Sequence, residues 1–181
     1  MTRKKILAIS GSTRKNSVNE FVLKGIKTTY HEILDVNIFD ELHSLPHFNP
    51  DIRDDDVSEV VKEFRRRINE ADGVIICTPE YVFSLPGTLK NALEWTVSTT
   101  VFADKPTAII VAAGLGEKTF ESLNLIMSTL GARIGEKSTL LIQGARAKIN
   151  PYQAGDEQTR SDINRLVQSL IEAVHNERAS N

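Results

Sequence analysis

The chain has 181 residues, a formal net charge of -2 and a pI of about 6.1, so no nucleic-acid or polyanion surface is expected. Its single cysteine excludes an internal disulfide framework and suits a reducing compartment. No apolar stretch approaches a membrane span, and the apolar run after Met1–Lys5 is too short for a signal peptide. We therefore expect one domain over residues 1–181 of a cytoplasmic protein with no membrane partner, with a polar tail after His175.

Five apolar runs alternate with five helical patterns along the chain. The expected strands are Lys5–Ser10, Ile33–Phe39, Gly73–Thr78, Thr107–Ala112 and Ser138–Ile142. Apolar residues recur at helical spacing over 18–29, 57–71 and 163–174, and shorter helices fit Gly87–Val97 and Thr119–Leu130, with Gly131 as a C-cap. Strict alternation predicts right-handed βαβ units. The expected fold is α/β, a flavodoxin-like three-layer sandwich with a five-stranded parallel sheet of order 2-1-3-4-5.

Ligands of such sheets bind beyond the carboxyl ends of the strands, where three unusual loops follow the first, third and fourth strands. The first loop suits an anion. Gly11 allows a tight turn, and the next helix points its free N–H groups and positive dipole end back at the loop. The loop offers hydroxyls, a guanidinium and an amide as donors: Ser10, Ser12, Thr13, Ser17, Arg14 and Asn19. A phosphate monoester fits this donor set, so we expect a phosphorylated cofactor here.

The other two loops suit a planar ligand. Prolines at both ends stiffen the loop over 78–86, so that its backbone groups can be presented at little entropic cost. Tyr81 and Phe83 in that loop offer aromatic surface for stacking. In the loop after the fourth strand, Gly114 and Gly116 allow close approach of a ring.

Two sequence motifs make this pattern more specific. They are Gly11-Ser12-x-Arg14-x-x-Ser17-x-Asn19 and Pro79-Glu80-Tyr81-x-x-Ser84-x-Pro86-Gly87-x-Leu89-Lys90-Asn91-Ala92-x-x-Trp95. With Phe48-Asn49-Pro50-Asp51 and Ala71-Asp72-Gly73, they resemble the NAD(P)H-dependent FMN reductase family, which includes bacterial quinone, chromate and azo-dye reductases. The resemblance runs from about residue 5 to residue 142, which is most of the chain.

This resemblance implies that NADPH or NADH passes a hydride to FMN, and that a quinone, free flavin or similar small acceptor then takes the electrons. The flavin carries that chemistry, so no catalytic acid or base is assigned. A homodimer or homotetramer is implied, with the flavin near a subunit interface and a lid from Leu45–Asp51 of the same or a neighbouring chain. The implied cofactor-binding residues are Ser10, Ser12, Thr13, Arg14, Ser17, Val18, Asn19, Pro79, Glu80, Tyr81, Val82, Ser84, Ala113, Gly114 and Gly116.

The chain departs from the family pattern at Val82, where relatives usually carry Asn. Valine removes one hydrogen-bond partner near the flavin, which keeps a second hypothesis open: a flavin-binding sensor that no longer turns over. A third hypothesis is a non-enzymatic electron carrier of the flavodoxin type, although such carriers tend to be strongly acidic. A dinucleotide-fold dehydrogenase is disfavoured because the first turn lacks Gly-x-Gly-x-x-Gly.

Several other conspicuous residues have plain structural interpretations. Cys77 lies inside the third strand, where it is expected to fill the core. His43 and His47 are separated by Pro46 and have no further ligand nearby, so no metal site is expected. The remaining expectations are helix capping by Asp54, Asp55 and Asp56, a solvated face for Arg65, Arg66 and Arg67, and a core or interface position for Trp95.

Overall fold

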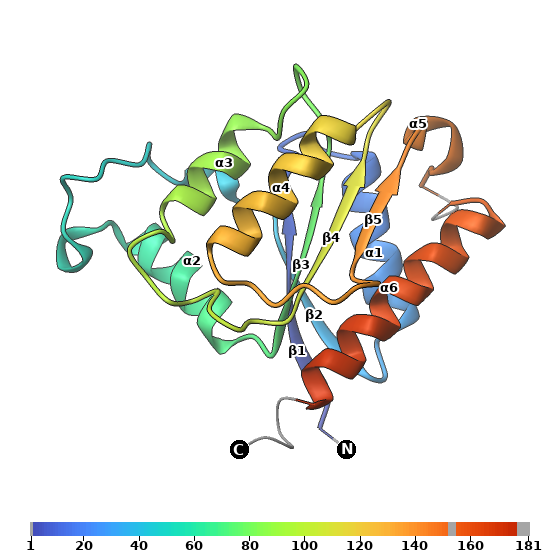
Figure 1. The fold of residues 1–181 in the computed structure, drawn as a ribbon, viewed down its shortest axis with the longest axis horizontal. Helices are drawn as coiled ribbons and strands as arrows, with labels where there is room; N and C mark the ends of the chain where they lie inside the picture. The colour runs from blue at the N-terminus through green and yellow to red at the C-terminus, as the bar shows by residue number, and fades with distance from the viewer. Residues whose placement is uncertain (1, 152–154, 177–181) are drawn as a thin grey trace.

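Five parallel strands form one sheet in the computed structural model, which describes residues 2–151 and 155–176 (Figure 1). The strands are β1 (Lys4–Ser10), β2 (Leu34–Phe39), β3 (Gly73–Thr78), β4 (Thr107–Ala112) and β5 (Thr139–Ile142). Their order is β2-β1-β3-β4-β5, which confirms the predicted flavodoxin-like topology. The order reverses between β1 and β3, which pair in register from Ile6 opposite Gly73 to Ser10 opposite Cys77. The carboxyl ends of these two strands therefore lie side by side.

Helices cover both faces of the sheet. They are α1 (Val18–Thr29), α2 (Glu59–Glu70), α3 (Gly87–Glu94), α4 (Glu117–Thr129), α5 (Ala145–Lys148) and α6 (Glu157–Asn176), with short 3-10 helices at Leu42–Ser44 and Asp54–Asp56. Figure 1 shows α2, α3 and α4 on one side and α1 and α6 on the other. Successive residues of β1 alternate between the two cores: Leu7 and Ile9 face the first group of helices, and Ile6 and Ala8 face the second. Strands β3 and β4 are buried along their whole length, as a doubly covered sheet requires.

Helix boundaries differ from the predicted ones where local hydrogen bonds change. The third predicted helix ends at Glu94 rather than Val97, because the next backbone N–H groups of Thr96 and Val97 donate to carbonyls only three residues back. Helix α4 begins at Glu117, two residues earlier than expected. Gly131 follows α4 with φ of 80°, as its predicted C-cap role requires. The polar tail predicted after His175 falls mainly outside the described residues.

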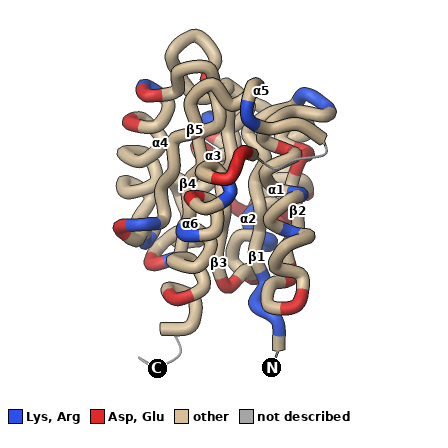
Figure 2. The backbone as a smooth tube through the Cα atoms, turned by 90° about the vertical axis from the view of Figure 1, so that its right-hand side faces the viewer, with Lys and Arg blue, Asp and Glu red and all other residues tan. Residues whose placement is uncertain are grey.

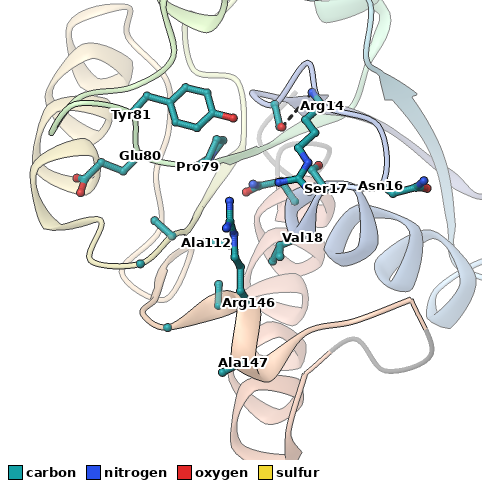
Figure 3. A pocket seen from close by; sticks show the side chains of 16 residues that line it. Arg14, Asn16, Ser17, Val18, Pro79, Glu80, Tyr81, Ala112, Arg146 and Ala147 are labelled. Carbon is teal, nitrogen blue, oxygen red and sulfur yellow. Dashed lines mark hydrogen bonds between the residues drawn. The ribbon is translucent and has the colours of Figure 1, made fainter.

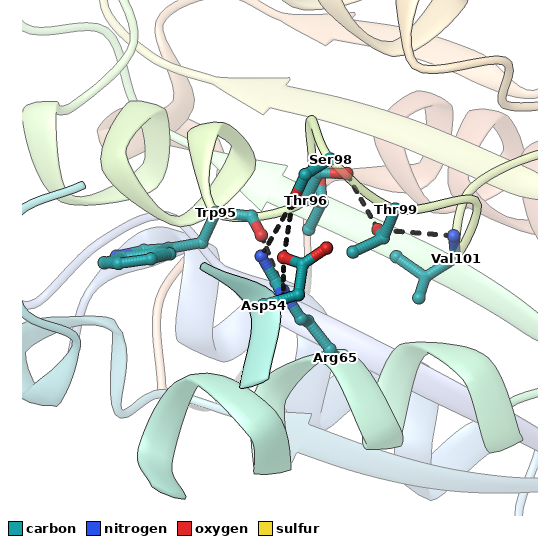
Figure 4. Close-up of polar contacts among 7 residues, drawn as sticks. All are labelled: Asp54, Arg65, Trp95, Thr96, Ser98, Thr99 and Val101. Carbon is teal, nitrogen blue, oxygen red and sulfur yellow. Dashed lines mark hydrogen bonds and ion pairs between the residues drawn. The ribbon is translucent and has the colours of Figure 1, made fainter. Parts of the chain in front are cut away.

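The acidic run before α2 does not cap that helix, so this prediction was wrong. The residue at the N-cap is Ser58, and Asp54 instead accepts hydrogen bonds from Arg65 Nη1 at 2.9 Å and from Ser98 Oγ at 2.8 Å (Figure 4). These donors, Ser98 first and then Arg65, lower the pKa of Asp54. Arg65 also donates from Nε to the Trp95 carbonyl, and its side chain is only 12% exposed. Arg65 is therefore a structural link between α2 and the end of α3 rather than part of a solvated face.

The segment Leu45–Asp51 is fastened to α3. The Pro46 carbonyl accepts hydrogen bonds from Asn91 Nδ2 and Trp95 Nε1, and the Phe48 N–H donates to Asn91 Oδ1. Phe48 packs edge-on against Trp95, which is 1% exposed and confirmed as a core residue. None of these contacts involves the carboxyl ends of β1, β3 or β4, and a role of this segment as a lid, in the same or a neighbouring chain, stays a prediction.

Candidate functional site

The loops after β1, β3 and β4 meet beyond the carboxyl ends of the strands and enclose a cavity of about 670 Å³ (Figure 3). This volume falls within the range of small-molecule and cofactor sites. Ten residues of the predicted set line the cavity: Ser12, Arg14, Ser17, Val18, Asn19, Pro79, Glu80, Tyr81, Ala113 and Gly114. Residues from three distant parts of the sequence are therefore brought together where the strand order predicts a ligand site.

Two serines of the first loop have hydroxyl protons left to donate. Ser17 is the N-cap of α1, and its Oγ accepts a hydrogen bond from the Glu20 N–H at 3.1 Å. Ser12 Oγ accepts from the Arg14 N–H at 3.3 Å. Each Oγ thus accepts one hydrogen bond from a backbone N–H group, and each hydroxyl proton can still be donated to an anion in the cavity. The guanidinium of Arg14 and the positive end of α1 add further attraction for an anion.

Gly11 holds the first loop tightly against β3. Its backbone N–H donates to the Cys77 carbonyl at 2.8 Å, and a Cβ at this position would lie 2.3 Å from Thr78 Oγ1. Any side chain here would push the loop away from the strand. Ser10 supports the loop from below, since its Oγ donates to the Ser12 carbonyl. Ser10 shapes the cavity without lining it.

Asn19 connects the cavity to the core through Cys77. The amide is almost completely buried, and its Oδ1 accepts a hydrogen bond from Cys77 Sγ at 3.3 Å. This contact leaves the amide N–H₂ as a donor toward the cavity. Cys77 is fully buried, and burial raises the pKa of its thiol. It is therefore the unreactive core residue that the sequence predicts.

Glu80 lies at the cavity edge, but its carboxylate is held by α4. The two carboxylate oxygens accept hydrogen bonds from the N–H groups of Gly116, at 3.0 Å, and Thr119, at 3.1 Å. Gly116 has φ of 96° and precedes α4 as its N-cap, so it supports the site from outside rather than lining the cavity. The negative charge of Glu80 is consequently balanced by a helix N-terminus.

Tyr81 and Ser84 close a two-residue hairpin turn. Each donates its N–H to the carbonyl of the other, at 2.8 and 3.0 Å, which leaves Val82 and Phe83 at the tip. Both tip residues have positive φ, of 52° and 56°, and their side chains are 95% and 68% exposed. The turn therefore directs Val82 into solvent, and neither Val82 nor Ser84 lines the cavity. Thr13 is likewise exposed and does not line it.

Comparison with known proteins decides the family. The NADPH-dependent FMN reductase family matches residues 4–147. The chain belongs to this family. It is 31% identical over 172 residues to the NADH:(hydroxy)cinnamate reductase subunit CrdA of Vibrio ruber, a match that covers 91% of this chain and 84% of the relative. It is 28% identical over 171 residues to the quinone reductase of Escherichia coli K12, a match that covers 91% and 90% of the two chains.

Solved structures agree with this assignment. The flavoenzyme NAD(P)H:(acceptor) oxidoreductase FerB from Paracoccus denitrificans superimposes with a TM-score of 0.81 at 25% identity, covering 96% of this chain and 98% of FerB. This chain, as a member of the NADPH-dependent FMN reductase family, is an oxidoreductase that uses FMN and NAD(P)H, as the sequence motifs predict. Among its described residues, no helix is long and apolar enough to cross a membrane.

The sequence motifs of this FMN reductase do not account for the whole cavity. Asn16 and Ala112 also line it, beside predicted residues. One side of the cavity comes from a segment that was not predicted at all, Gly144–Ala147, which follows β5 and begins α5. The signal that could have revealed it was present: a fifth parallel strand must end at the same edge of the sheet, and Arg146 follows that end closely.

Proposed function

We propose that the cavity between the loops after β1, β3 and β4 is the FMN site. The donor set at its α1 end carries this proposal, because Ser12, Ser17 and Arg14 direct two hydroxyls and a guanidinium at one place. These donors can bond to the terminal oxygens of a phosphate monoester, which are strong hydrogen-bond acceptors. The buried amide of Asn19 supplies a further N–H₂ donor beside them.

The rest of the cavity suits the flavin ring. Ala112, Ala113 and Gly114 bring small side chains and open backbone to one wall, and a Cβ at Gly114 would touch nothing within 4 Å. Pro79 and Tyr81, from the loop after β3, line the cavity on the same side as Ala112. When bound, the flavin supplies the redox chemistry, in which a hydride from the nicotinamide is accepted and two electrons pass to the acceptor. In this proposal the protein contributes binding and orientation, and no side chain acts as acid or base.

We propose a quinone, a free flavin or a related small aromatic compound as the electron acceptor. Relatives named as quinone reductases support this choice, as does the chemistry of the cavity rim. Tyr81 is half-exposed at the cavity wall, and Leu115 lies exposed next to Gly114. Aromatic and aliphatic side chains at a rim favour stacking of planar, weakly polar molecules.

We also propose that the enzyme works as a homodimer or homotetramer in the cytoplasm, where NAD(P)H is available. Exposed apolar side chains near the cavity support an interface there: Val82, Phe83 and Leu115. Sedimentation equilibrium of the purified protein tests the assembly, and a monomer at micromolar concentration would contradict it.

Identification of the bound chromophore tests the FMN site. The purified protein is incubated with an excess of FMN and FAD in equal amounts, freed of unbound flavin and heated, and the released flavin is separated by chromatography. We expect FMN at about one molecule per chain. Retention of FAD in preference to FMN, or no retained flavin, would overturn the proposal.

A further inference from the structure

Arg146 is held at the cavity by the backbone around it. The N–H groups of Gly144 and Ala145 donate to the carbonyls of Gly114 and Ala113, both at 3.0 Å, so the start of α5 is fixed to the loop after β4. Ala145 and Ile149 are buried in the core beneath α1 and α6. Because these two residues anchor the inner side of α5, Arg146 is left on the outer side, which borders the cavity.

Arg14 and Arg146 extend into the same cavity from opposite sides. Figure 3 shows Arg14 descending from the loop before α1 and Arg146 rising from α5, with both guanidinium groups directed into the space between them. Within the described part of the chain, neither guanidinium has a hydrogen-bond or ion-pair partner. Among the described residues that line the cavity, Glu80 is the one acidic residue, and its carboxylate accepts hydrogen bonds from Gly116 and Thr119.

The cavity therefore carries two positive charges that no group among the described residues balances. Two guanidinium groups directed at one space repel each other, and a dianion between them removes that repulsion. A phosphate monoester carries a charge close to -2 at neutral pH and has three acceptor oxygens. Arginine binds phosphate oxygens with two parallel N–H donors, so two arginines and two serine hydroxyls can satisfy all three oxygens.

We propose that Arg146 is a second phosphate-binding residue, which closes on the FMN phosphate from the side opposite Arg14. This inference rests on the FMN site proposed above. It adds a contact from α5, beyond the loop and helix that the sequence motifs mark. In this arrangement the phosphate is held between α1 and α5, two elements separated by more than a hundred residues of sequence.

The affinities of the variants for FMN and for riboflavin, which lacks the phosphate, distinguish a contact of Arg146 with the phosphate from a contact with the rest of the flavin. We expect Arg146→Gln to weaken FMN binding by about tenfold to a hundredfold, as for a hydrogen bond between charged groups, and to leave riboflavin binding unchanged. Arg146→Lys retains the charge without the planar fork, so an intermediate loss is expected. Lys148→Gln is the matched control: it removes a positive charge from the same helix but lies outside the cavity, and FMN affinity should stay within about twofold of wild type. Flavin fluorescence titration gives each dissociation constant.

Three results would overturn the proposal. Equal loss of FMN and riboflavin affinity would place Arg146 against the ring or the ribityl chain. Unchanged FMN affinity together with a raised KM for NADPH, but not for NADH, would place it on a phosphate of the nicotinamide donor. Unchanged binding in Arg146→Gln, with FMN affinity lost in Arg14→Ala, would reject the role of Arg146 and leave the FMN site intact. If wild-type protein binds FMN no more tightly than riboflavin, the FMN site itself fails.

Discussion

Glu80, just beyond the carboxyl end of β3, accepts a hydrogen bond from the backbone N–H of Gly116, 36 residues later in the chain, at 3.0 Å. The same carboxylate accepts from Thr119 at 3.1 Å. Helix α4 has no side-chain cap of its own, because glycine occupies its N-cap, and Glu80 supplies the missing acceptors from another loop. The Glu80 side chain therefore accepts hydrogen bonds from the free N–H groups at the start of α4, and it links the loop after β3 to the loop after β4.

Replacement of Glu80 should destabilise the protein. Glu80→Ala leaves two N–H groups of α4 without acceptors, and loss of an N-cap costs about 0.5–2 kcal/mol. We expect the free energy of unfolding in urea to fall by about 1–3 kcal/mol, because these hydrogen bonds involve a charged group. Glu121→Ala is the control, since this exposed residue of α4 forms a surface ion pair with Lys118, and its replacement should change stability by less than about 0.5 kcal/mol. Equal stability of the two variants would contradict the capping role.

Replacement of Val82, at the tip of the hairpin turn, should stabilise the folded protein. A left-handed backbone costs a β-branched residue roughly 1–2 kcal/mol, whereas Asn tolerates it. Val82→Asn should thus raise the free energy of unfolding by about 1 kcal/mol. FMN affinity should change by less than about tenfold, because the Val82 side chain points into solvent and offers no contact within the cavity. Val97→Asn, at an exposed valine without positive φ, should bring no such gain. A large change in FMN affinity would show instead that Val82 meets the cofactor.

Wild-type activity also decides between the reductase and a sensor that has lost turnover through Val82. The positive φ of Val82 suits Asn by backbone conformation, so the Asn that the family resemblance implies at this position needs no catalytic role for its amide. We therefore expect wild-type protein to oxidise NADPH or NADH with a quinone. Turnover that appears only in Val82→Asn would support the sensor.

Substitutions of Ser17 and Arg14 should affect folding stability and FMN binding to different degrees. Ser17→Ala removes both the N-cap of α1 and a phosphate donor, so it should lower stability by about 0.5–2 kcal/mol and also weaken FMN binding. Ser17→Asp retains a good cap but places a negative charge where the phosphate is proposed, so stability should be kept while FMN binding is lost. Arg14→Ala should weaken FMN binding by about tenfold to a hundredfold with little effect on stability, since its side chain is exposed. Tight FMN binding by Ser17→Asp would contradict the phosphate loop.

Protonation of Glu63 should account for part of the loss of folding stability at low pH. Hydrogen bonds from Arg66, and then Arg67, lower its pKa from 4.5 to about 2. A pKa that is lower in the folded state stabilises the fold fully above pH 4.5, and this contribution is lost as the pH falls toward about 2. The stability of Glu63→Gln should therefore decline less steeply than that of wild type over this range, and the difference should shrink in high salt because the pair is exposed. Parallel pH profiles in urea unfolding would contradict this.

The sequence was sufficient for the sheet because buried strands have a simple pattern. The predicted bounds of Gly73–Thr78 and Thr107–Ala112 match β3 and β4, since an uninterrupted apolar run is what a doubly covered strand needs. Strict alternation with helices predicted a parallel sheet, and the presence of five strands suggested their order. The same reasoning located the cavity, because a parallel sheet brings the carboxyl ends of its strands to one edge.

Features that depend on long-range contacts could not be predicted from the pattern. Helix α5 has only four residues, too few to show a helical repeat, so Arg146 was missed. Glu80 was predicted to line the flavin, largely through backbone groups; the contacts of its carboxylate with Gly116 and Thr119 are fixed only by tertiary structure, so they were not predicted. Asp54 lies before a helix, as a cap would, yet Arg65 and Ser98 offer its carboxylate stronger partners than the helix end does.

Anaerobic reduction of the FMN-loaded protein tests the central claim most directly. NADPH or NADH is added first without an acceptor, the nicotinamide is removed, and a quinone is then added while flavin absorbance is followed. We predict that the nicotinamide alone bleaches the flavin and that the quinone restores its colour, whereas free FMN under the same conditions reacts far more slowly. Bound FMN that neither nicotinamide reduces would contradict the account and favour an electron carrier or sensor.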